Sequence, residues 1–526
     1  MKIVQSQNIL NWYPFNKTDK ILIIGKQSKE LIDMLNKKVS DVTIIEKIID
    51  KNLDNTKYDF IIMVGILENW NTITENRINF ETLLNRISQN LNLHGKLLIA
   101  IDNKFGLRFF AGNPEKILKR KFESLIGYNN NPEKIESFTK QRIKKLLNKL
   151  GYNTRFYYPL PDYKIPNVIF TDEQLPEYNS IDKYNPYFEE NSDILFNEID
   201  VFREILKTDK NMFTFFTNSF LIEATKEECN KEYKYISFNN IRKEEYRLIT
   251  KISDDCVEKQ KISDKSIKHY NEIISNIEIL KNNKINTLDY VEEGKIKSKY
   301  IEQKYLLNNV LVEMLEQKKY DKFYNVIDNY MKIISTNSYK ESNPENTVFN
   351  KYNIKIKNKE EISNLNFVSK GLWDMTFKNC FFIDNDFWFF DQEWEEDNIP
   401  VEYILYRSIY YTISLRRFIK IDNLLERYNL IQYLDLFTKL DNKIQEKIRD
   451  NEIWKFYSEN HDFDIDATKQ ELLNISIRDN AKEGRIKQLE EENAKLKIEN
   501  QNLNKQVDKN IFKRVKKKLQ SIKKLK

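Results

Sequence analysis

Cysteine and histidine are scarce in this chain, with three of each among 526 residues. The cysteines, Cys229, Cys256 and Cys380, lie far apart. They form neither a CxxC pair nor a Cys/His spacing of the kind that holds zinc. The sequence therefore predicts neither a disulfide framework nor a zinc site.

Long apolar runs are lacking as well. No stretch reaches the roughly 18 consecutive apolar residues of a transmembrane helix, and the N-terminal segment lacks the apolar core of a signal peptide. We therefore expect a cytoplasmic protein.

The net charge of +6 belongs to one end of the chain. Residues 509–526 carry nine Lys or Arg and no acid, so subtracting +9 from +6 leaves −3 for residues 1–508. A nucleic-acid-binding domain concentrates positive charge on a folded face. We therefore expect no nucleic acid as partner of the folded body.

The length exceeds what one hydrophobic core supports, so we expect several domains. Up to about residue 102, apolar runs alternate with helical spacing. Residues 21–25, 42–46, 58–67 and 95–102 are predicted strands, and residues 31–35 and 78–91 are predicted helices. This alternation predicts a Rossmann-like α/β domain with a parallel sheet, which binds ligands at the carboxyl ends of its strands.

Two residues at those strand ends are candidate cofactor ligands. Gly25 ends the first strand, and Glu46 follows 21 residues later at the tip of the second. That separation suits an acid that accepts hydrogen bonds from ribose hydroxyls. An acid at a strand end can equally be a solvated surface residue.

Four sequence strings add a resemblance to a family. They are GILEN (65–69), IDNKFGLRFFAGNPE (101–115), FYYPLPDYKIPNVIFTDEQLP (156–176) and TNSFLIEA (217–224). With them, residues 15–225 resemble bacterial class I methyltransferase-like domains of cell-surface polysaccharide gene clusters. The resemblance implies S-adenosylmethionine as cofactor.

The loop after the first strand departs from that family. It reads Gly-Lys-Gln-Ser-Lys-Glu from Gly25 to Glu30, where the family has several glycines that let the backbone approach the cofactor. Loss of the cofactor and weak retained binding are both open.

A second constellation lies at residues 372–394, LWDMTFKNCFFIDNDFWFFDQEW. Asp374 precedes Asn379 by five residues, and Asp391 follows Asn379 by twelve. Residues 381–390 are predicted to form a hairpin with a polar turn at 384–386, which would bring Asn379 and Asp391 together. Phosphoryl transfer needs a carboxylate at the acceptor hydroxyl and two oxygen ligands for Mg²⁺.

This constellation resembles the catalytic loop and metal-binding strand of aminoglycoside and choline kinase-like phosphotransferases. The resemblance implies ATP and Mg²⁺, with Asp374 as the catalytic residue and Asn379 and Asp391 as metal ligands. Lys259 is the candidate phosphate-binding lysine, with Lys261 as alternative and Glu272 as the expected ion-pair partner. Surface positions for the lysine and Glu272 are also open, because both residue types are abundant here.

Two departures leave catalysis open. No glycine-rich phosphate loop is visible, and Trp373 stands where the family often has histidine. Arg407, among apolar neighbours, is predicted to be an internal ion-pair partner.

The C-terminal arm carries a heptad pattern from residue 486. Leucine occupies the d positions 489, 496 and 503, and asparagine occupies the a positions 493 and 500, which favours a parallel two-stranded coiled coil. A single charged helix is the alternative. Residues 461–485 are predicted as a linker or frayed helix.

The tail, residues 509–526, has an apolar stripe at 511, 512, 515, 519 and 522 among lysines. A basic amphipathic helix suits an anionic membrane surface. The alternatives are a solvated or a nucleic-acid-binding end.

The predicted organisation is a methyltransferase-like domain (1–225), a kinase-like domain (226–460), the linker, a coiled coil (486–508) and the tail. This order resembles bifunctional methyltransferase–kinases that cap O-antigen polysaccharides at the inner membrane. It implies a homodimeric transferase acting on a glycan or lipid-linked glycan. The alternative is a pseudoenzyme scaffold for polysaccharide biosynthesis.

Overall fold

The computed structural model describes residues 7–48, 56–74, 80–128, 135–178, 180–187, 194–357, 360–453 and 465–523. These divide into two compact units, residues 1–461 and 462–526. In the described part of the chain, no helix combines the length and the apolar character needed to cross a membrane.

The N-terminal half of the first unit is built on β1 to β7, and helices cover both faces of this sheet. The strands are β1 (Lys20–Ile24), β2 (Asp41–Ile45), β3 (Tyr58–Val64), β4 (Leu91–Asp102), β5 (Asn153–Leu160), β6 (Val168–Thr171) and β7 (Ser219–Thr225). The helices are α1 (Asn8–Asn11), α2 (Lys29–Lys38), the 3₁₀ helix η1 (Leu67–Thr72), α3 (Phe80–Ser88), α4 (Leu107–Phe110), α5 (Glu123–Ile126), α6 (Lys140–Lys149), α7 (Glu198–Thr208) and α8 (Met212–Phe216).

Strand periodicity explains the two covered faces. Ile21 and Ile23 of β1 face a core shared with α1 and α2. Leu22 and Ile24 face the opposite core, which α3, α6, α7 and α8 complete. Alternate residues of a strand point to opposite faces, so a strand that is apolar throughout is buried on both.

The parallel sheet predicted from residues 21–102 is confirmed for β2-β1-β3-β4. Beyond β4 the sheet continues with antiparallel strands. There β7 pairs antiparallel with both β4 and β5, and β6 pairs antiparallel with β5. The architecture is Rossmann-like with a mixed sheet.

The sheet continues without a break into the C-terminal half. β6 pairs with β8 (Tyr235–Phe238), and the order runs on through β9 (Leu248–Ile252), β10 (Cys256–Lys261), β12 (Lys295–Lys299) and β11 (Asp289–Glu292). Helix α9 (Ile267–Asn282) packs on these last strands through Ile273 and Ile277. The boundary predicted at 225/226 stays a prediction, and twelve strands form one sheet across it.

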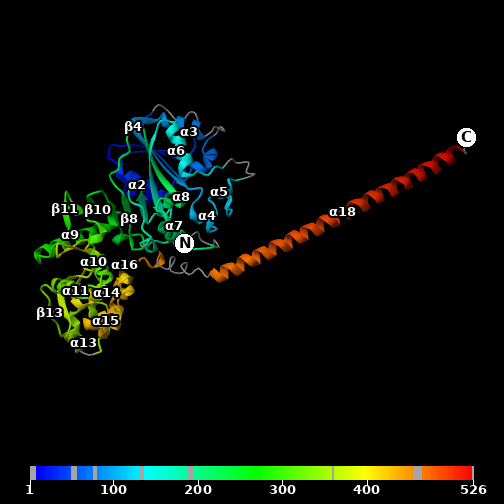
Figure 1. Ribbon diagram of the computed structural model, residues 1–526. Coiled ribbons are helices and arrows are strands. Elements are labelled where there is room, and N and C mark those ends of the chain that lie inside the picture. The colour runs from blue at the N-terminus through cyan, green and yellow to red at the C-terminus, as the bar shows by residue number, and fades with distance from the viewer. Residues whose placement is uncertain are drawn as a thin grey trace. The chain divides into compact units, whose positions relative to one another are not determined.

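Residues 307–448 form a mainly helical lobe beside α9, β10 and β11 (Figure 1). Its helices are α10 (Leu307–Glu316), α11 (Tyr320–Ile334), α12 (Val348–Lys351), α13 (Glu360–Ser363), α14 (Val401–Tyr410), α15 (Ile421–Arg427) and α16 (Leu434–Ile448). Its strands are β13 (Tyr339–Lys340), β14 (Asn366–Leu372), β17 (Glu395–Pro400) and the hairpin of β15 (Cys380–Ile383) with β16 (Asp386–Phe389). The predicted hairpin is confirmed, since Ile383 pairs with Asp386 and the turn residues Asp384 and Asn385 have positive φ.

The described residues of the second unit form one helix, α18 (Ile465–Lys523). At about 1.5 Å per residue its 59 residues span roughly 88 Å. It includes residues 465–485, predicted as a linker or frayed helix. The heptad leucines Leu489, Leu496 and Leu503 are each about half exposed. Of the predicted tail stripe, the side chains at 511, 519 and 522 lie outside the described residues.

Candidate active sites

The first candidate site lies at the carboxyl ends of β1 and β2. The structure brings Gly25 and Glu46 together there, since the Gly25 amide donates to the carbonyl of Ile45, the last residue of β2. Glu46 itself is exposed. Its position agrees with the predicted one.

The loop after β1 does not form a cofactor cradle. A Cβ at Gly25 would lie 2.7 Å from Cγ2 of Ile66, so packing within the protein already requires this glycine. The Gln27 amide nitrogen donates to the carbonyls of Val64, at 3.1 Å, and Ile24, at 3.4 Å. It thereby bridges the ends of β3 and β1, the switch point where a nucleotide would bind. S-adenosylmethionine does not fit this arrangement unless Gln27 moves.

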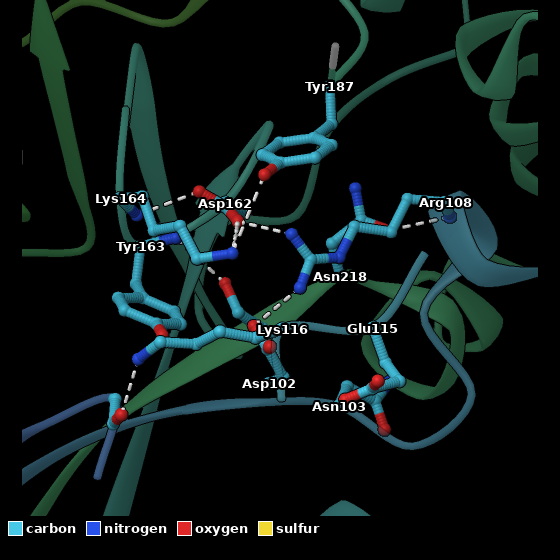
Figure 2. A network of polar contacts seen from close by, with 12 residues as sticks. Asp102, Asn103, Arg108, Glu115, Lys116, Asp162, Tyr163, Lys164, Tyr187 and Asn218 are labelled. Atoms are coloured by element: carbon cyan, nitrogen blue, oxygen red, sulfur yellow. Dashed lines mark hydrogen bonds and ion pairs between the residues drawn. The ribbon is translucent and has the colours of Figure 1, made fainter. Parts of the chain in front are cut away.

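The four resemblance strings meet at one neighbouring place. The Asp102 amide donates to Oε1 of Glu68 at 2.6 Å, and the Arg108 amide donates to Oδ1 of Asn218 at 2.9 Å. Arg108 also forms ion pairs with Asp102, at 2.7 Å, and Asp162, at 2.6 Å (Figure 2). From the sequence, these strings indicated only the family resemblance. They did not predict that their polar residues form one network.

Arg108 is the centre of this network, and its side chain is only 2% exposed. Its guanidinium lies 4.6 Å from the ring centroid of Phe109 and 4.5 Å from that of Tyr187. Burial disfavours its charge, but Asp102 and Asp162 outweigh that effect and hold the pKa of Arg108 above its usual value. Lys164 contacts the same Asp162 and the Tyr187 hydroxyl (Figure 2). The pairs of opposite charge fix the loops at the carboxyl edge of the sheet.

A cavity of about 300 Å³ opens beside this network. Three acids, Glu68, Asp102 and Glu115, line it together with Lys116. The Lys116 ammonium donates to the Gly65 carbonyl at 2.6 Å (Figure 2). Burial, reinforced by Asp102, raises the pKa of Glu68.

The second candidate site contains the residues predicted for phosphoryl transfer. Lys259 of β10 forms ion pairs with Asp391 and Glu393. Burial disfavours the charged lysine, but the two carboxylates outweigh it, and its pKa is raised. The expectation that Glu272 pairs with Lys259 is wrong. Glu272 lies half exposed on α9, near Lys268 and His269.

Glu393, and not Glu272, is the glutamate that pairs with Lys259. It is buried close to three basic side chains. It pairs with Lys259 and Arg242, and His269 Nε2 lies 3.7 Å away. The field of Arg242 and Lys259 outweighs burial and lowers the pKa of Glu393 well below its usual value. In the sequence, the one hint of this role is that Glu393 is the acid of the DQEW string, two residues after Asp391.

Asp374, Asn379 and Asp391 lie on neighbouring segments, and their predicted meeting around a cation stays a prediction. The Asn379 amide nitrogen donates to the Asp374 carbonyl at 3.1 Å, and the Phe390 amide donates to the Asn379 carbonyl at 3.1 Å. The Asp391 backbone, at φ +60°, is held by a hydrogen bond from its amide to Oδ2 of Asp289 at 2.8 Å. With its nitrogen engaged, Asn379 can turn its Oδ1 toward a cation.

Burial raises the pKa of Asp374 to about 7. Arg407 and Arg242 oppose this shift, while the charges of Glu393 and Asp391 add to it. Asp374 is therefore poised to exchange a proton near neutral pH. Arg407 pairs with Asp441, which confirms the predicted internal ion pair.

The described residues contain no group of three or more His, Cys, Asp or Glu side chains arranged to hold a metal. A cation bound by Asn379 and Asp391 would therefore take its remaining ligands from phosphate and water. That arrangement is the usual one for Mg²⁺.

No family model matches the chain, and no curated protein matches it. Among solved structures, similar chains include a SAM dependent methyltransferase from Archaeoglobus fulgidus. It is 13% identical, with 42% of this chain and 92% of that chain covered and a TM-score of 0.26.

A putative S-adenosylmethionine dependent methyltransferase from Listeria monocytogenes is 12% identical, with coverage of 42% and 99% and a TM-score of 0.21. The cyclopropane synthase MmaA2 from Mycobacterium tuberculosis is 11% identical, with coverage of 42% and 82% and a TM-score of 0.24. The likeness is to the methyltransferase fold over about 42% of the chain. Identities and scores this low carry no activity over to this chain.

Replacing Arg108 by leucine should destabilise the first unit by about 3–5 kcal/mol, because Asp102 and Asp162 would remain buried without their nearest counter-charge. Adding Asp162→Asn should restore part of the loss. Urea denaturation measures both. Lys207→Leu, which removes an exposed pair with Glu204, is the control and should cost less than about 1 kcal/mol. Equal losses for the two variants would contradict the central role of Arg108.

The raised pKa of Asp374 predicts a pH-dependent stability. The folded state binds this proton more tightly than the unfolded chain. The stabilisation of the folded state by protonated Asp374 is therefore complete below the ordinary pKa of 3.8 and is lost as pH rises through about 7. Asp374→Asn should accordingly gain melting temperature relative to wild type as pH rises from about 5.5 to about 8.5. Calorimetry without nucleotide tests this. Asp386→Asn, in the exposed turn, should show no such trend.

Proposed function

We propose that the C-terminal half is a Mg·ATP-dependent phosphotransferase of kinase-like fold. The observation that carries this proposal is the ion pair between buried Lys259 and Asp391, beside Asp374 and Asn379. The strand order β8-β9-β10-β12-β11, with α9 between β10 and β11, supports the fold assignment. These are the parts that phosphoryl transfer requires: a lysine for phosphate, two metal ligands and a base.

The roles follow from the geometry. Asn379 and Asp391 would hold Mg²⁺, and Lys259 would contact phosphate oxygens once Asp391 turns to the metal. Glu393 would keep the lysine in place, since it is paired to both Lys259 and Arg242. Mg·ATP would supply the phosphoryl group.

Asp374 would accept the proton of an acceptor hydroxyl. The hydroxyl oxygen then forms a bond to the γ-phosphorus while the bond from that phosphorus to the ADP oxygen breaks. Because the pKa of Asp374 is about 7, the rate should rise as pH increases through neutrality. The resemblance of residues 15–225 supports a cell-surface glycan or lipid-linked glycan as acceptor.

Methyl transfer by the N-terminal half is the second candidate. The cavity beside Asp102 and Glu68 favours it, since that cavity lies at the carboxyl edge where a Rossmann-like sheet binds ligands. Gln27 opposes it by bridging β1 and β3. A scaffold role for this half is the alternative, and its sheet directly supports β8.

Dimerisation through α18 and membrane contact through residues 509–526 complete the proposal. Five exposed apolar side chains at a and d positions support the dimer: Ile486, Leu489, Leu496, Leu503 and Val507. Exposed Phe512 and Val515 among lysines support contact with an anionic membrane surface, which would place a cytoplasmic protein at the inner face of the membrane.

Calorimetric titration tests the phosphotransferase. Wild type should bind Mg·ATP, and Asp391→Asn should weaken binding at least about tenfold because a charged contact to the metal is lost. Asp374→Asn should bind normally and slow basal ATP hydrolysis by about 10²–10⁴-fold. Asp386→Asn is the matched control. A wild-type protein that binds no Mg·ATP would contradict the proposal. A parallel titration with S-adenosylmethionine tests the second candidate, and binding would support methyl transfer.

Sedimentation tests the dimer. The full chain should sediment as a dimer, and alanine at the three d-position leucines of α18 should give a monomer because the apolar seam is lost. Ile498→Ala is a fitting control, since Ile498 is an equally exposed apolar residue at an f position, away from the seam. A monomeric wild type would favour the single charged helix.

A further inference from the structure

A cavity of about 290 Å³ opens beside Asp374, and Lys259 is not among the residues that line it. Residues of the loop and short helix after β14 line it together with the C-terminal ends of α14 and α16. The lining residues are all polar or charged, namely Asp374, Thr376, Lys378, Asn379, Arg407, Ser408, Tyr411, Thr412, Asp441, Gln445 and Arg449. Such a lining suits a hydrophilic ligand whose hydroxyl could reach Asp374.

The lining charges are unbalanced toward positive. Three cations, Lys378, Arg407 and Arg449, stand against two carboxylates, Asp374 and Asp441. Asp441 is already engaged, because it accepts from the hydroxyls of Tyr403, at 2.9 Å, and Tyr411, at 2.6 Å, and pairs with Arg407. Its charge is therefore directed at the protein and not at the cavity.

The charge of Arg407 acts on Arg449, which also lines the cavity. Burial lowers the pKa of Arg449, and Arg407 lowers it further, although Tyr411 opposes the shift. An anion in the cavity would relieve this repulsion.

Neutralising a helix end is a competing role for Arg449, which follows α16 directly. Lys378 is not part of α14 or α16 and lies on the 3₁₀ helix Phe377–Asn379. It lines the cavity one residue before Asn379. Lys378 therefore carries the stronger part of the case.

Building on the proposed phosphotransfer, we propose that this cavity binds the acceptor and that the acceptor carries its own anionic group. Lys378 and Arg449 hold a phosphate or carboxylate while a hydroxyl of the same molecule reaches Asp374. Cationic acceptors such as amines are excluded by the same charges. The substrate class is thus a hydroxylated phosphate ester or sugar acid.

The test is calorimetric titration of the full chain with four probes: glucose 1-phosphate, glucuronate, glucose and glucosamine. The first two should bind at least about tenfold more tightly than the last two, since charge-assisted contacts are lost without the anion. Comparing the first two distinguishes phosphate from carboxylate. Lys378→Gln should weaken their binding about tenfold, and Lys378→Arg should restore most of it.

Lys439→Gln, an exposed lysine of α16 paired with Asp435, is the matched control and should change nothing. The inference is overturned if neither anion binds at millimolar concentration, if glucose or glucosamine binds as well as the anions, or if Lys378→Gln has no effect. Mg·ATP is titrated separately into the same protein. Anion binding without Mg·ATP binding would contradict the phosphotransferase and support the anion site. Mg·ATP binding without anion binding would support the phosphotransferase and contradict the anion site.

Discussion

Buried charge requires compensation, and that constraint organises the C-terminal half of this protein. Lys259, Arg242, Asp391 and Glu393 come from three different segments, yet each of them is held by opposite charge from another segment. Removing one partner would leave an uncompensated ion in the interior. The cluster therefore fixes β10, the loop between β8 and β9, and the segment after the β15–β16 hairpin in one arrangement.

The aromatic residues around this cluster add to the same constraint. Trp373 and Trp394 stack with ring centroids 5.7 Å apart, and His269 stacks on Trp394 at 4.5 Å. The guanidinium of Arg407 lies 4.5 Å from the Trp373 ring centroid. The tryptophan in place of the family's histidine thus links the Asp374 loop to the Glu393 segment by packing, where a histidine would offer a hydrogen bond.

Sequence patterns predicted the strands, the helices and the contacts within one loop and hairpin. They did not predict the contacts that depend on how segments far apart in the sequence pack together. The spacing of Asp374, Asn379 and Asp391 is local to one loop and hairpin, so hairpin pairing alone brings them together. The partner of Lys259 depends on how α9 packs, and no local pattern separates Glu272 from Glu393. The antiparallel β7 was missed because nothing in a strand's own sequence states its neighbour's direction. Gln27 went unnoticed for a similar reason, since its partner Val64 lies 37 residues away.

The loop between β8 and β9 has anchors on three sides. Asn240 bonds to Asn8 and Asn167 of the N-terminal half. Arg242 reaches Glu393, and the Lys243 amide donates to the Ile448 carbonyl of the helical lobe. In a two-lobed nucleotide enzyme the lobes usually swing apart to exchange product. If the C-terminal half binds nucleotide as proposed, a swing of the helical lobe away from the sheet would have to break the Arg242–Glu393 pair and the hydrogen bond from Lys243 to Ile448, so this loop would resist the opening that releases product.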